Sequence, residues 1–477
     1  MTAAHDEAAE DARLPWSFAD VVRATGADVR RRGAAESFTG VVTDSRTIGR
    51  GALFVALRGE RFDANHFAAE AAGAGAAGVV VEHVPPELEG FRDLAVLTVP
   101  DGLRALQNLA SDLRQRLDPC VLAITGSNGK TTTKEMLAAI LAAAGGVGDV
   151  LKTRVNLNNL IGVPLTLLRL SGAERYAVVE MGMNAPGEIA RLTEIADPDV
   201  GVITNVAPAH LEGVGSIEGV ARAKGELFAG MRRDATAIVN ADDPHVAALG
   251  AAFGGRVVRF SVLDGGDVRA EDVRTDAQGA ASFRLLVGDA SAVVRLRVSG
   301  RHNVANALAA AAAAHAVGVG LEAIAAGLGA ALPVGSRMRV CPLPSGITVI
   351  DDSYNANPAS MAAALRSLRE APAARRIAVL GDMLELGAGA DGLHREVGRL
   401  AGELGVDTLY LFGEHAAVTA DGALEGGLAA KSIRALPTHA AIAEALQATL
   451  RPGDWVLVKG SRGQRMEEVV RLLGAAE

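Results

Sequence analysis

The chain has 477 residues, more than one hydrophobic core usually holds, which predicts about two to four domains. Apolar residues make up 49% and charged residues 22%, the composition of an ordinary globular protein. The net charge of −9 argues against a nucleic-acid partner, which requires a basic face, and two cysteines are too few for a disulfide framework.

The N-terminal residues 1–15 are acidic and lack a basic segment followed by an apolar core, so we predict a disordered tail and not a secretory signal. The longest apolar region, 306–332, is interrupted by His315 and Glu322 and is interpreted as buried helices. We therefore expect a cytoplasmic protein, a monomer, that does not span a membrane.

Short β-branched runs alternate with helical patterns along most of the chain, which predicts α/β layers with mostly parallel sheets. Three domains are expected, at 16–100, 101–332 and 333–477. The expected strands are 40–43, 53–56, 78–82, 121–125, 176–180, 200–205, 235–240, 347–351, 377–381, 407–412 and 454–458, with a helix at 66–72. The segment 256–298 is predicted to form antiparallel strands.

The second domain contains the most informative segment, in which a strand ending near Ile124 is followed by TGSNGKTT and then by a helical pattern. A strand, a glycine loop and a helix in this order form a phosphate cradle, because inward N–H groups and the helix N-terminus attract anions. The predicted nucleotide contacts are Gly126, Ser127, Asn128, Gly129, Lys130, Thr131 and Thr132. The alternative is a glycine turn with an exposed lysine.

Two polar residues follow the next strands of the predicted sheet. Glu180 ends the strand YAVVE, where it could bind Mg²⁺ or remain an exposed carboxylate at the strand end. His210 follows the strand after that. Imidazole is an unusual Mg²⁺ ligand, so spacing alone favours a hydrogen-bonded structural histidine.

Lys224 lies in the helical pattern SIEGVARAKGELFAG, on the same face as Val220, Leu227 and Phe228. Apolar surroundings disfavour the ammonium form and make the neutral amine available. Addition of CO2 would then give a carbamate whose oxygens could hold a second Mg²⁺. The pattern alone favours the alternative, in which the side chain extends to solvent.

Further polar clusters follow along the chain. RHNVANALAA places Asn303 and Asn306 one helical turn apart, where they could bracket a purine edge, although Asn303 could instead cap the helix. In the third domain, IDDSYNANP and VLVKGSRG place polar residues directly after strands, and the second offers Lys459 and Arg462 as anion contacts. Such loops, facing a P-loop domain, would close over a phosphoryl-transfer site.

Together these segments resemble the Mur ligase family of peptidoglycan synthesis, over nearly the whole chain. The shared residues are TGSNGKTTT, Glu180, His210, the lysine in ARAKGELF and HNVANALAA. NLNNLIGVPLTLL, VVEMGMNAPGEIA, DDSYNANP and LGDMLELG are similar to the branch that adds a dipeptide, and the DNPR-type motif of the diaminopimelate-adding branch is absent.

The resemblance implies three α/β domains: an N-terminal uridine-nucleotide domain, a central P-loop domain with a mostly parallel sheet, and a C-terminal Rossmann-like domain. It implies ATP-dependent ligation of D-alanyl-D-alanine to UDP-N-acetylmuramoyl-tripeptide through an acyl phosphate. It also implies domain closure around the substrates, so an open form is expected without them.

The resemblance also implies roles for single residues. Thr131, Glu180, His210 and Lys224, the last as a carbamate, are expected at two Mg²⁺ sites, and Lys130, His210 and Lys224 are expected to be catalytic. Ser45 and Arg46 are expected at the UDP moiety, and Asp352 at the ATP ribose. Further expected ATP contacts are Asn303, Asn306 and Arg337, and further expected substrate contacts are Asn158, Asn159, Tyr354, Asn355, Asn357 and Lys459. His394 matches a recurrent family position and is interpreted as structural.

Two other functions stay open at this stage. An amide ligase of the same superfamily that adds a single amino acid, such as folylpolyglutamate synthase, would use a different amine. A P-loop ATPase that drives a conformational change would hydrolyse ATP without a second substrate and would give the first domain no role.

Overall fold

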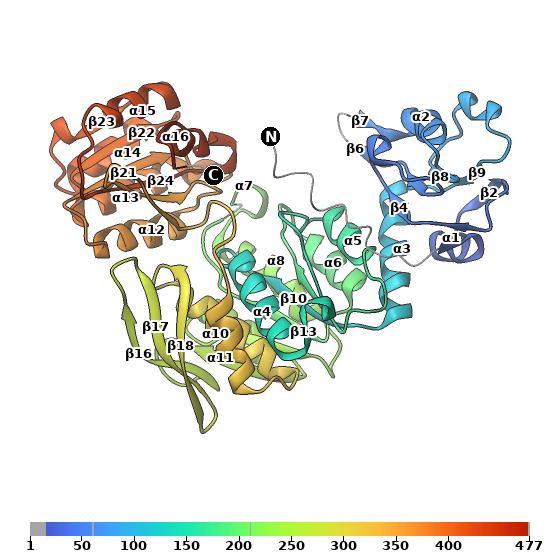
Figure 1. The fold of residues 1–477 in the computed structure, drawn as a ribbon, viewed down its shortest axis with the longest axis horizontal. Helices are drawn as coiled ribbons and strands as arrows, with labels where there is room; N and C mark the ends of the chain where they lie inside the picture. The colour runs from blue at the N-terminus through green and yellow to red at the C-terminus, as the bar shows by residue number, and fades with distance from the viewer. Residues whose placement is uncertain (1–15, 60–61, 210, 476–477) are drawn as a thin grey trace.

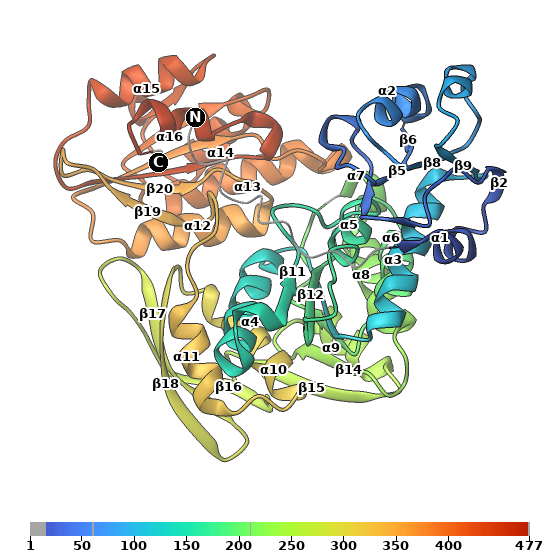
Figure 2. The same ribbon diagram turned by 45° about the vertical axis from the view of Figure 1, so that its right-hand side comes forward.

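The computed structural model describes residues 16–59, 62–209 and 211–475. The predicted N-terminal tail and His210 therefore lie outside the described residues. Figures 1 and 2 show three lobes, with the N-terminal and C-terminal lobes on opposite sides of the central one. The predicted three-domain α/β fold is confirmed, whereas its exact boundaries stay predictions.

The N-terminal lobe contains a mostly parallel sheet in the order β2-β9-β8-β5-β4, in which only β2 pairs antiparallel. The lobe is formed by β1 (Trp16–Ser17), α1 (Phe18–Thr25), β2 (Asp28–Arg31), β3 (Ser37–Phe38), β4 (Val41–Val42), β5 (Leu53–Val55), β6 (Arg58–Gly59), β7 (Phe62–Asp63), α2 (Ala68–Gly73), β8 (Gly78–Val81) and β9 (Ala95–Thr98). Helix α3 (Gly102–Leu117) packs against α1 on one side and against helices of the central lobe on the other.

The central lobe is built on a nine-stranded sheet in the order β11-β12-β10-β13-β14-β15-β16-β17-β18. Its strands are β10 (Cys120–Thr125), β11 (Val150–Lys152), β12 (Tyr176–Glu180), β13 (Val200–Ile203), β14 (Thr236–Asn240), β15 (Arg256–Ser261), β16 (Val268–Thr275), β17 (Ala280–Val287) and β18 (Ala290–Ser299). The prediction of antiparallel strands throughout 256–298 is wrong for β15, which pairs parallel with β14 and with the start of β16. Helix α9 (Pro244–Ala252) makes a crossover between β14 and β15, and such a crossover produces a parallel pair.

Helices cover both faces of this sheet because side chains alternate along the buried strands. In β10, Val121 and Ala123 face one apolar cluster, whereas Leu122 and Ile124 face the other. The helices of the central lobe are α4 (Lys130–Gly145), α5 (Gly162–Leu167), α6 (Glu188–Ala196), α7 (Leu211–Val214), α8 (Ile217–Gly230), α9 (Pro244–Ala252), α10 (Asn303–Ala316) and α11 (Leu321–Ala330). Helices α4, α10 and α11 share one face, and α3, α5, α6 and α8 share the other.

The C-terminal lobe has a six-stranded sheet in the order β19-β20-β24-β21-β22-β23, parallel except for β19. Its elements are β19 (Arg339–Pro342), β20 (Thr348–Asp352), α12 (Pro358–Glu370), β21 (Arg375–Gly381), α13 (Ala390–Glu403), β22 (Thr408–Phe412), α14 (Ala416–Glu425), β23 (Ile433–Ala435), α15 (His439–Gln447), β24 (Asp454–Lys459) and α16 (Glu467–Leu472). Within the part of the chain that the structure describes, no helix is both long enough and apolar enough to cross a bilayer.

Candidate active site

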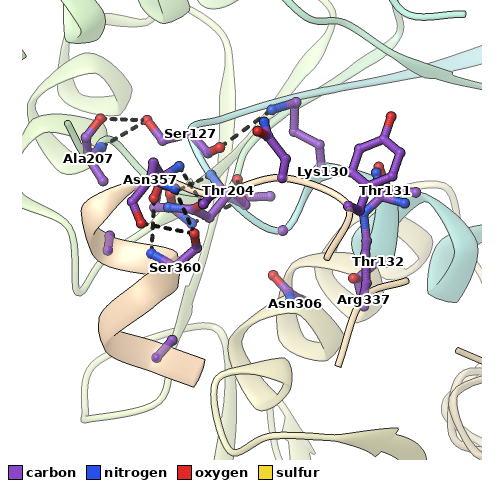
Figure 3. Close-up of a pocket in the computed structure, with 18 of the residues that line it drawn as sticks. Ser127, Lys130, Thr131, Thr132, Thr204, Ala207, Asn306, Arg337, Asn357 and Ser360 are labelled. Carbon is purple, nitrogen blue, oxygen red and sulfur yellow. Dashed lines mark hydrogen bonds between the residues drawn. The ribbon is translucent and has the colours of Figure 1, made fainter. Parts of the chain in front are cut away.

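A cavity of about 660 Å³ lies between the central and C-terminal lobes. Its walls come from the loops after β10 and β11, the ends of β12, β13 and β24, the start of α10, the loop after β20 and the start of α12. Figure 3 shows Asn357 and Ser360 of α12 beside Ser127 and Thr204 of the central lobe. Sixteen of the predicted residues line this cavity together with Glu180: Ser127, Asn128, Gly129, Lys130, Thr131, Thr132, Asn158, Asn159, Asn303, Asn306, Arg337, Asp352, Tyr354, Asn355, Asn357 and Lys459.

The loop between β10 and α4 depends on glycine at two positions. Gly126 has φ +145°, and a Cβ there would lie 1.9 Å from the hydroxyl oxygen of Thr204. Gly129 has φ +82°, and a Cβ there would lie 2.1 Å from Oδ1 of Asn306. Any other residue would therefore be strained and would collide with a neighbouring element.

Lys130 begins α4, and its Nζ donates a hydrogen bond to the Gly126 carbonyl at 2.8 Å. Burial lowers the pKa of Lys130, and the nearby charge of Glu180 opposes this shift. The alternative of an exposed lysine on a glycine turn is wrong, because the ammonium folds back over the loop. This arrangement places a cation and inward-facing backbone at a helix N-terminus, which is the geometry of an anion site.

Glu180 ends β12, as predicted, and its carboxylate is buried, so the alternative of an exposed strand-end carboxylate is wrong. Its Oε2 accepts a hydrogen bond from Thr131 Oγ1 at 2.9 Å, and its Oε1 accepts one from Asn158 Nδ2 at 2.9 Å. A carboxylate beside a hydroxyl oxygen is a donor set that suits Mg²⁺. These two residues therefore fit a divalent cation at the end of the phosphate loop.

Lys224 lies on α8 with only 1% of its surface exposed, and Val220, Leu227 and Phe228 on the same face are buried as well. Extension of the side chain to solvent is therefore excluded. Burial lowers the pKa of Lys224 well below its ordinary value, and the positive charge of Lys130 lowers it further. Both effects disfavour the ammonium form and favour the neutral, nucleophilic amine.

The two-metal arrangement stays a prediction. Among the described residues, no three His, Cys, Asp or Glu side chains gather as a metal-binding group. The predicted second site depends on His210, which lies outside those residues, and on a carbamate at Lys224.

Asn303 and Asn306 both line the cavity from the first turn of α10. Asn306 Nδ2 donates to Asn303 Oδ1 at 2.7 Å, and Asn303 Nδ2 donates to the Ser299 carbonyl at 2.7 Å. Asn303 does not cap the helix, since His302 occupies the cap position. The pair forms a short chain of amide groups whose remaining donors and acceptors can face a ligand.

The C-terminal lobe contributes a buried ion pair and a stacked arginine. Lys459 Nζ donates to Asp352 Oδ2 at 2.6 Å and to the Asn355 carbonyl at 2.9 Å. The guanidinium of Arg337 lies 3.7 Å from the ring centroid of Tyr354. The charge of Lys459 is thus balanced by Asp352. Arg337 presents a guanidinium cation that stacks on an aromatic ring at the cavity wall.

Asn357 connects the two lobes directly. Its Oδ1 accepts a hydrogen bond from Ser360 N at 2.9 Å and so caps α12, while its Nδ2 donates to Asn128 Oδ1 at 2.8 Å. Asn128 belongs to the phosphate loop, so one side chain both starts a helix of the C-terminal lobe and contacts the central lobe.

Ser45 and Arg46 are not brought to this cavity, because both lie in the N-terminal lobe. Ser45 Oγ donates to Glu70 at 3.2 Å, and Arg46 pairs with Asp44 while 83% of its side chain is exposed. Hydrogen bonds from Arg46 lower the pKa of Asp44 to about 2. Their contact with a UDP group stays a prediction. It would place the UDP group in the N-terminal lobe, outside this cavity.

Sequence reasoning overlooked several residues at the site. His302 lines the cavity, and burial lowers its pKa against the opposing charge of Asp352. Its position next to Asn303 in RHNVANALAA could have indicated it. Asn156, Asn184, Glu188 and Thr204 also line the cavity. Asn156 and Asn184 lie in irregular loops, Thr204 follows β13, and Glu188 begins α6, and at such positions residue spacing carries little information.

Comparison with known proteins identifies matches to three domain models: Mur ligase family, catalytic domain, at 37–114, Mur ligase middle domain at 124–314, and Mur ligase, glutamate ligase domain, at 336–462. A curated relative from Escherichia coli (strain K12), named UDP-N-acetylmuramoyl-tripeptide–D-alanyl-D-alanine ligase, is 44% identical over 93% of this chain and 95% of its own length.

Solved structures agree with the sequence matches. A crystal structure of MurF from Acinetobacter baumannii superposes with a TM-score of 0.89 at 35% identity and covers 96% of this chain and 99% of that one. MurF from Thermotoga maritima, in complex with ADP, gives a TM-score of 0.81 at 29% identity, with 91% and 96% covered. The chain therefore belongs to the Mur ligase family.

Proposed function

We propose that this protein joins D-alanyl-D-alanine to UDP-N-acetylmuramoyl-tripeptide at the expense of ATP, giving the UDP-linked pentapeptide of peptidoglycan synthesis. The observation that carries the proposal is the convergence, in one cavity, of a phosphate loop and the polar loops of the C-terminal lobe. The full-length relatives that bear this name support the identity of the substrates.

The reaction requires activation of a carboxylate, because a carboxylate oxygen is a poor leaving group. The terminal carboxylate of the tripeptide attacks the γ-phosphorus of ATP, which gives an acyl phosphate and ADP. The free amine of D-alanyl-D-alanine then attacks the acyl carbon, the C–O bond to phosphate breaks, and an amide and inorganic phosphate result. Enclosure between lobes keeps water away from the acyl phosphate.

The phosphate loop would bind the triphosphate through its backbone, with Gly126, Ser127, Asn128, Gly129 and Thr132 around the phosphates. Lys130 would neutralise the charge that develops on the migrating phosphoryl group. Asn303 and Asn306 are proposed at the adenine, Asp352 at the ribose, and Arg337 at the phosphates once it leaves the ring of Tyr354.

Mg²⁺ is proposed in two sites. Thr131 and Glu180 would supply oxygens at the first, and His210 with carbamylated Lys224 would hold the second. When bound, Mg²⁺ would neutralise charge on the phosphoryl and carboxylate oxygens. The lowered pKa of buried Lys224 supports carbamylation, since only the free amine adds CO2.

The remaining contacts are divided between the lobes. Asn158 and Asn159 are proposed to hold the muramoyl-peptide, and Ser45 and Arg46 its UDP end. Tyr354, Asn355, Asn357 and Lys459 are proposed around the dipeptide. A monomer in the cytoplasm is proposed as well.

A ligation assay with a choice of amines tests this proposal. The protein is incubated with ATP, Mg²⁺ and UDP-N-acetylmuramoyl-tripeptide, and ADP release is measured with D-alanyl-D-alanine, D-alanine, diaminopimelate or glutamate. We expect stimulation by the dipeptide and a product whose mass equals that of the two substrates minus one water. Stimulation by a single amino acid, or ADP release without any UDP-substrate, would overturn it.

A further inference from the structure

Lys134 is a buried lysine that the proposed reaction does not use. It lies on α4, one turn after Thr131, and only 1% of its surface is exposed. An ammonium group is seldom buried so completely unless partners surround it. The identity of those partners therefore indicates what the residue does.

The Lys134 ammonium contacts three separate parts of the central lobe. Its Nζ donates to the Thr153 carbonyl at 2.8 Å, and it lies 3.0 Å from Glu135 Oε1 and 3.7 Å from Glu180 Oε2. Helix α4, the end of β12 and the first residue after β11 thus meet at one charge.

Glu180 is held from several sides at this point. Thr131 and Asn158 each donate to one of its carboxylate oxygens, and its own N–H donates to Thr153 Oγ1 at 3.0 Å. The Lys134 ammonium lies near Oε2, whereas Asn158 donates to Oε1. Rotation of this carboxylate would break the hydrogen bonds from Thr131 and Asn158 and change its distance from the cation.

Thr153 also begins the loop 153–159, whose asparagines 156, 158 and 159 line the cavity. Lys134 therefore anchors the start of a wall that is proposed to receive the muramoyl-peptide. The same ammonium thus contacts Glu180, on the nucleotide side of the cavity, and the start of loop 153–159, on the acceptor side.

We propose that Lys134 is a positioning residue that keeps Glu180 and loop 153–159 in register, so that the carboxylate to be activated meets the γ-phosphate. This role rests on the proposed function. The competing explanation is that Lys134 only neutralises Glu135. Lys152 allows the two explanations to be distinguished, because it also forms an ion pair with Glu135. Its side chain is 45% exposed, so it makes this pair from the solvent side.

The test compares Lys134→Met with the matched variant Lys152→Met, each of which removes one cation from Glu135. We expect Lys134→Met to raise both the Mg²⁺ concentration for half-maximal rate and the KM for the UDP-substrate by about tenfold or more, as loss of a supporting partner at a metal site does. Lys152→Met should leave both within about twofold of wild type, since exposed ion pairs contribute little. Equal behaviour of the two variants, or a Lys134→Met that changes kcat alone, would overturn the proposal.

Two further variants guard against misfolding of Lys134→Met. Lys134→Gln keeps a donor for the Thr153 carbonyl without the charge, so it should recover the KM for the UDP-substrate more than the Mg²⁺ requirement. Lys134→Arg keeps the charge and should recover the Mg²⁺ requirement more; the opposite pattern would also overturn the proposal. Calorimetric titration with Mg²⁺ and a non-hydrolysable ATP analogue needs no ligation, so it tests Lys134 even if wild-type protein forms no pentapeptide.

Discussion

The buried amine of Lys224 is the side chain whose surroundings have the largest chemical consequence. Its helix places it among apolar neighbours, and Lys130 adds a repelling charge. Both effects disfavour the ammonium form and raise the share of the neutral amine, which is the form that reacts. A carbamate at Lys224 would place negatively charged oxygens at a position where the unmodified amine has none.

Lys224→Ala is expected to abolish ligation, because the oxygens of the proposed carbamate are lost. Short-chain carboxylic acids added to the assay should partly restore activity by supplying those oxygens. Product formation is measured by mass with and without the acid. Arg222→Ala, an exposed residue on the same helix, serves as control. Full activity of Lys224→Ala would remove this residue from the mechanism.

His394 is buried and holds the loop that follows β21. Its Nε2 accepts a hydrogen bond from Met383 N at 2.9 Å, and its Nδ1 lies 2.8 Å from the Ala390 carbonyl, so the ring is neutral with the proton on Nδ1. Burial lowers its pKa; His415 lowers it further, while Asp382 and Asp391 oppose the shift. These contacts support the structural interpretation.

The lowered pKa of His394 makes stability depend on pH. As pH falls below about 6.5, the unfolded chain binds the proton before the folded protein does, so the free energy of unfolding falls until the folded pKa is reached. His394→Gln should flatten this slope and, by disturbing the Met383 hydrogen bond, destabilise by about 1–3 kcal/mol at neutral pH. Chemical denaturation from pH 5 to pH 8 measures both, at about 25 °C. The control His315→Gln changes an exposed histidine and should keep the wild-type slope. His302 also has a lowered pKa, but its contribution to the slope is the same in every variant. An unchanged slope in His394→Gln would contradict the assignment.

At the scale of elements, α12 is placed by its own first turn. Asn357 and Ser360 form a reciprocal capping box, and Pro358 follows the cap, which favours a helix start at this point. The side-chain oxygen of Asn357 accepts the capping hydrogen bond, which leaves its Nδ2 free to donate to Asn128. Helix initiation and contact between lobes therefore depend on the same amide.

Asn357→Ser separates the two roles, because serine caps a helix about as well as asparagine but cannot reach Asn128 with an amide donor. We expect unchanged stability of the C-terminal lobe and a KM for ATP raised by roughly two- to tenfold, the equivalent of about 0.5–1.5 kcal/mol for one hydrogen bond. Asn357→Ala should add a loss of about 1 kcal/mol in stability. Steady-state kinetics and thermal unfolding measure these effects. A normal KM for ATP in the serine variant would show that the Asn128 contact is not used.

Local sequence patterns predicted the position of a strand or the buried face of a helix well, because each depends on one segment of the chain. The β-branched runs gave β10, β12 and β14 nearly to the residue, and the face of α8 predicted the burial of Val220 beside Lys224. The parallel pairing of β15 was missed, because pairing depends on which strand the chain returns to. Lys134 was missed for the same kind of reason: its partners Thr153 and Glu180 are distant in the sequence.

At the scale of the whole molecule, the phosphate loop and the expected UDP contacts lie in different lobes. Lys130→Ala should therefore eliminate phosphoryl transfer while the affinity for the UDP-substrate stays nearly unchanged. ADP release and calorimetric binding measure the two effects separately. Loss of affinity for the UDP-substrate in this variant would mean that the two sites are wrongly placed.

The lobes are joined in unequal ways. One apolar cluster runs without interruption from Trp16, through α3, to the helices of the central lobe, whereas the C-terminal lobe has clusters of its own. The connection at 332–335 is exposed. A protease that cuts this connection should release the last third of the chain as a folded piece, while the first two thirds should melt as one unit. Any rigid-body motion during turnover is then expected in the C-terminal lobe, while the N-terminal and central lobes stay fixed relative to each other.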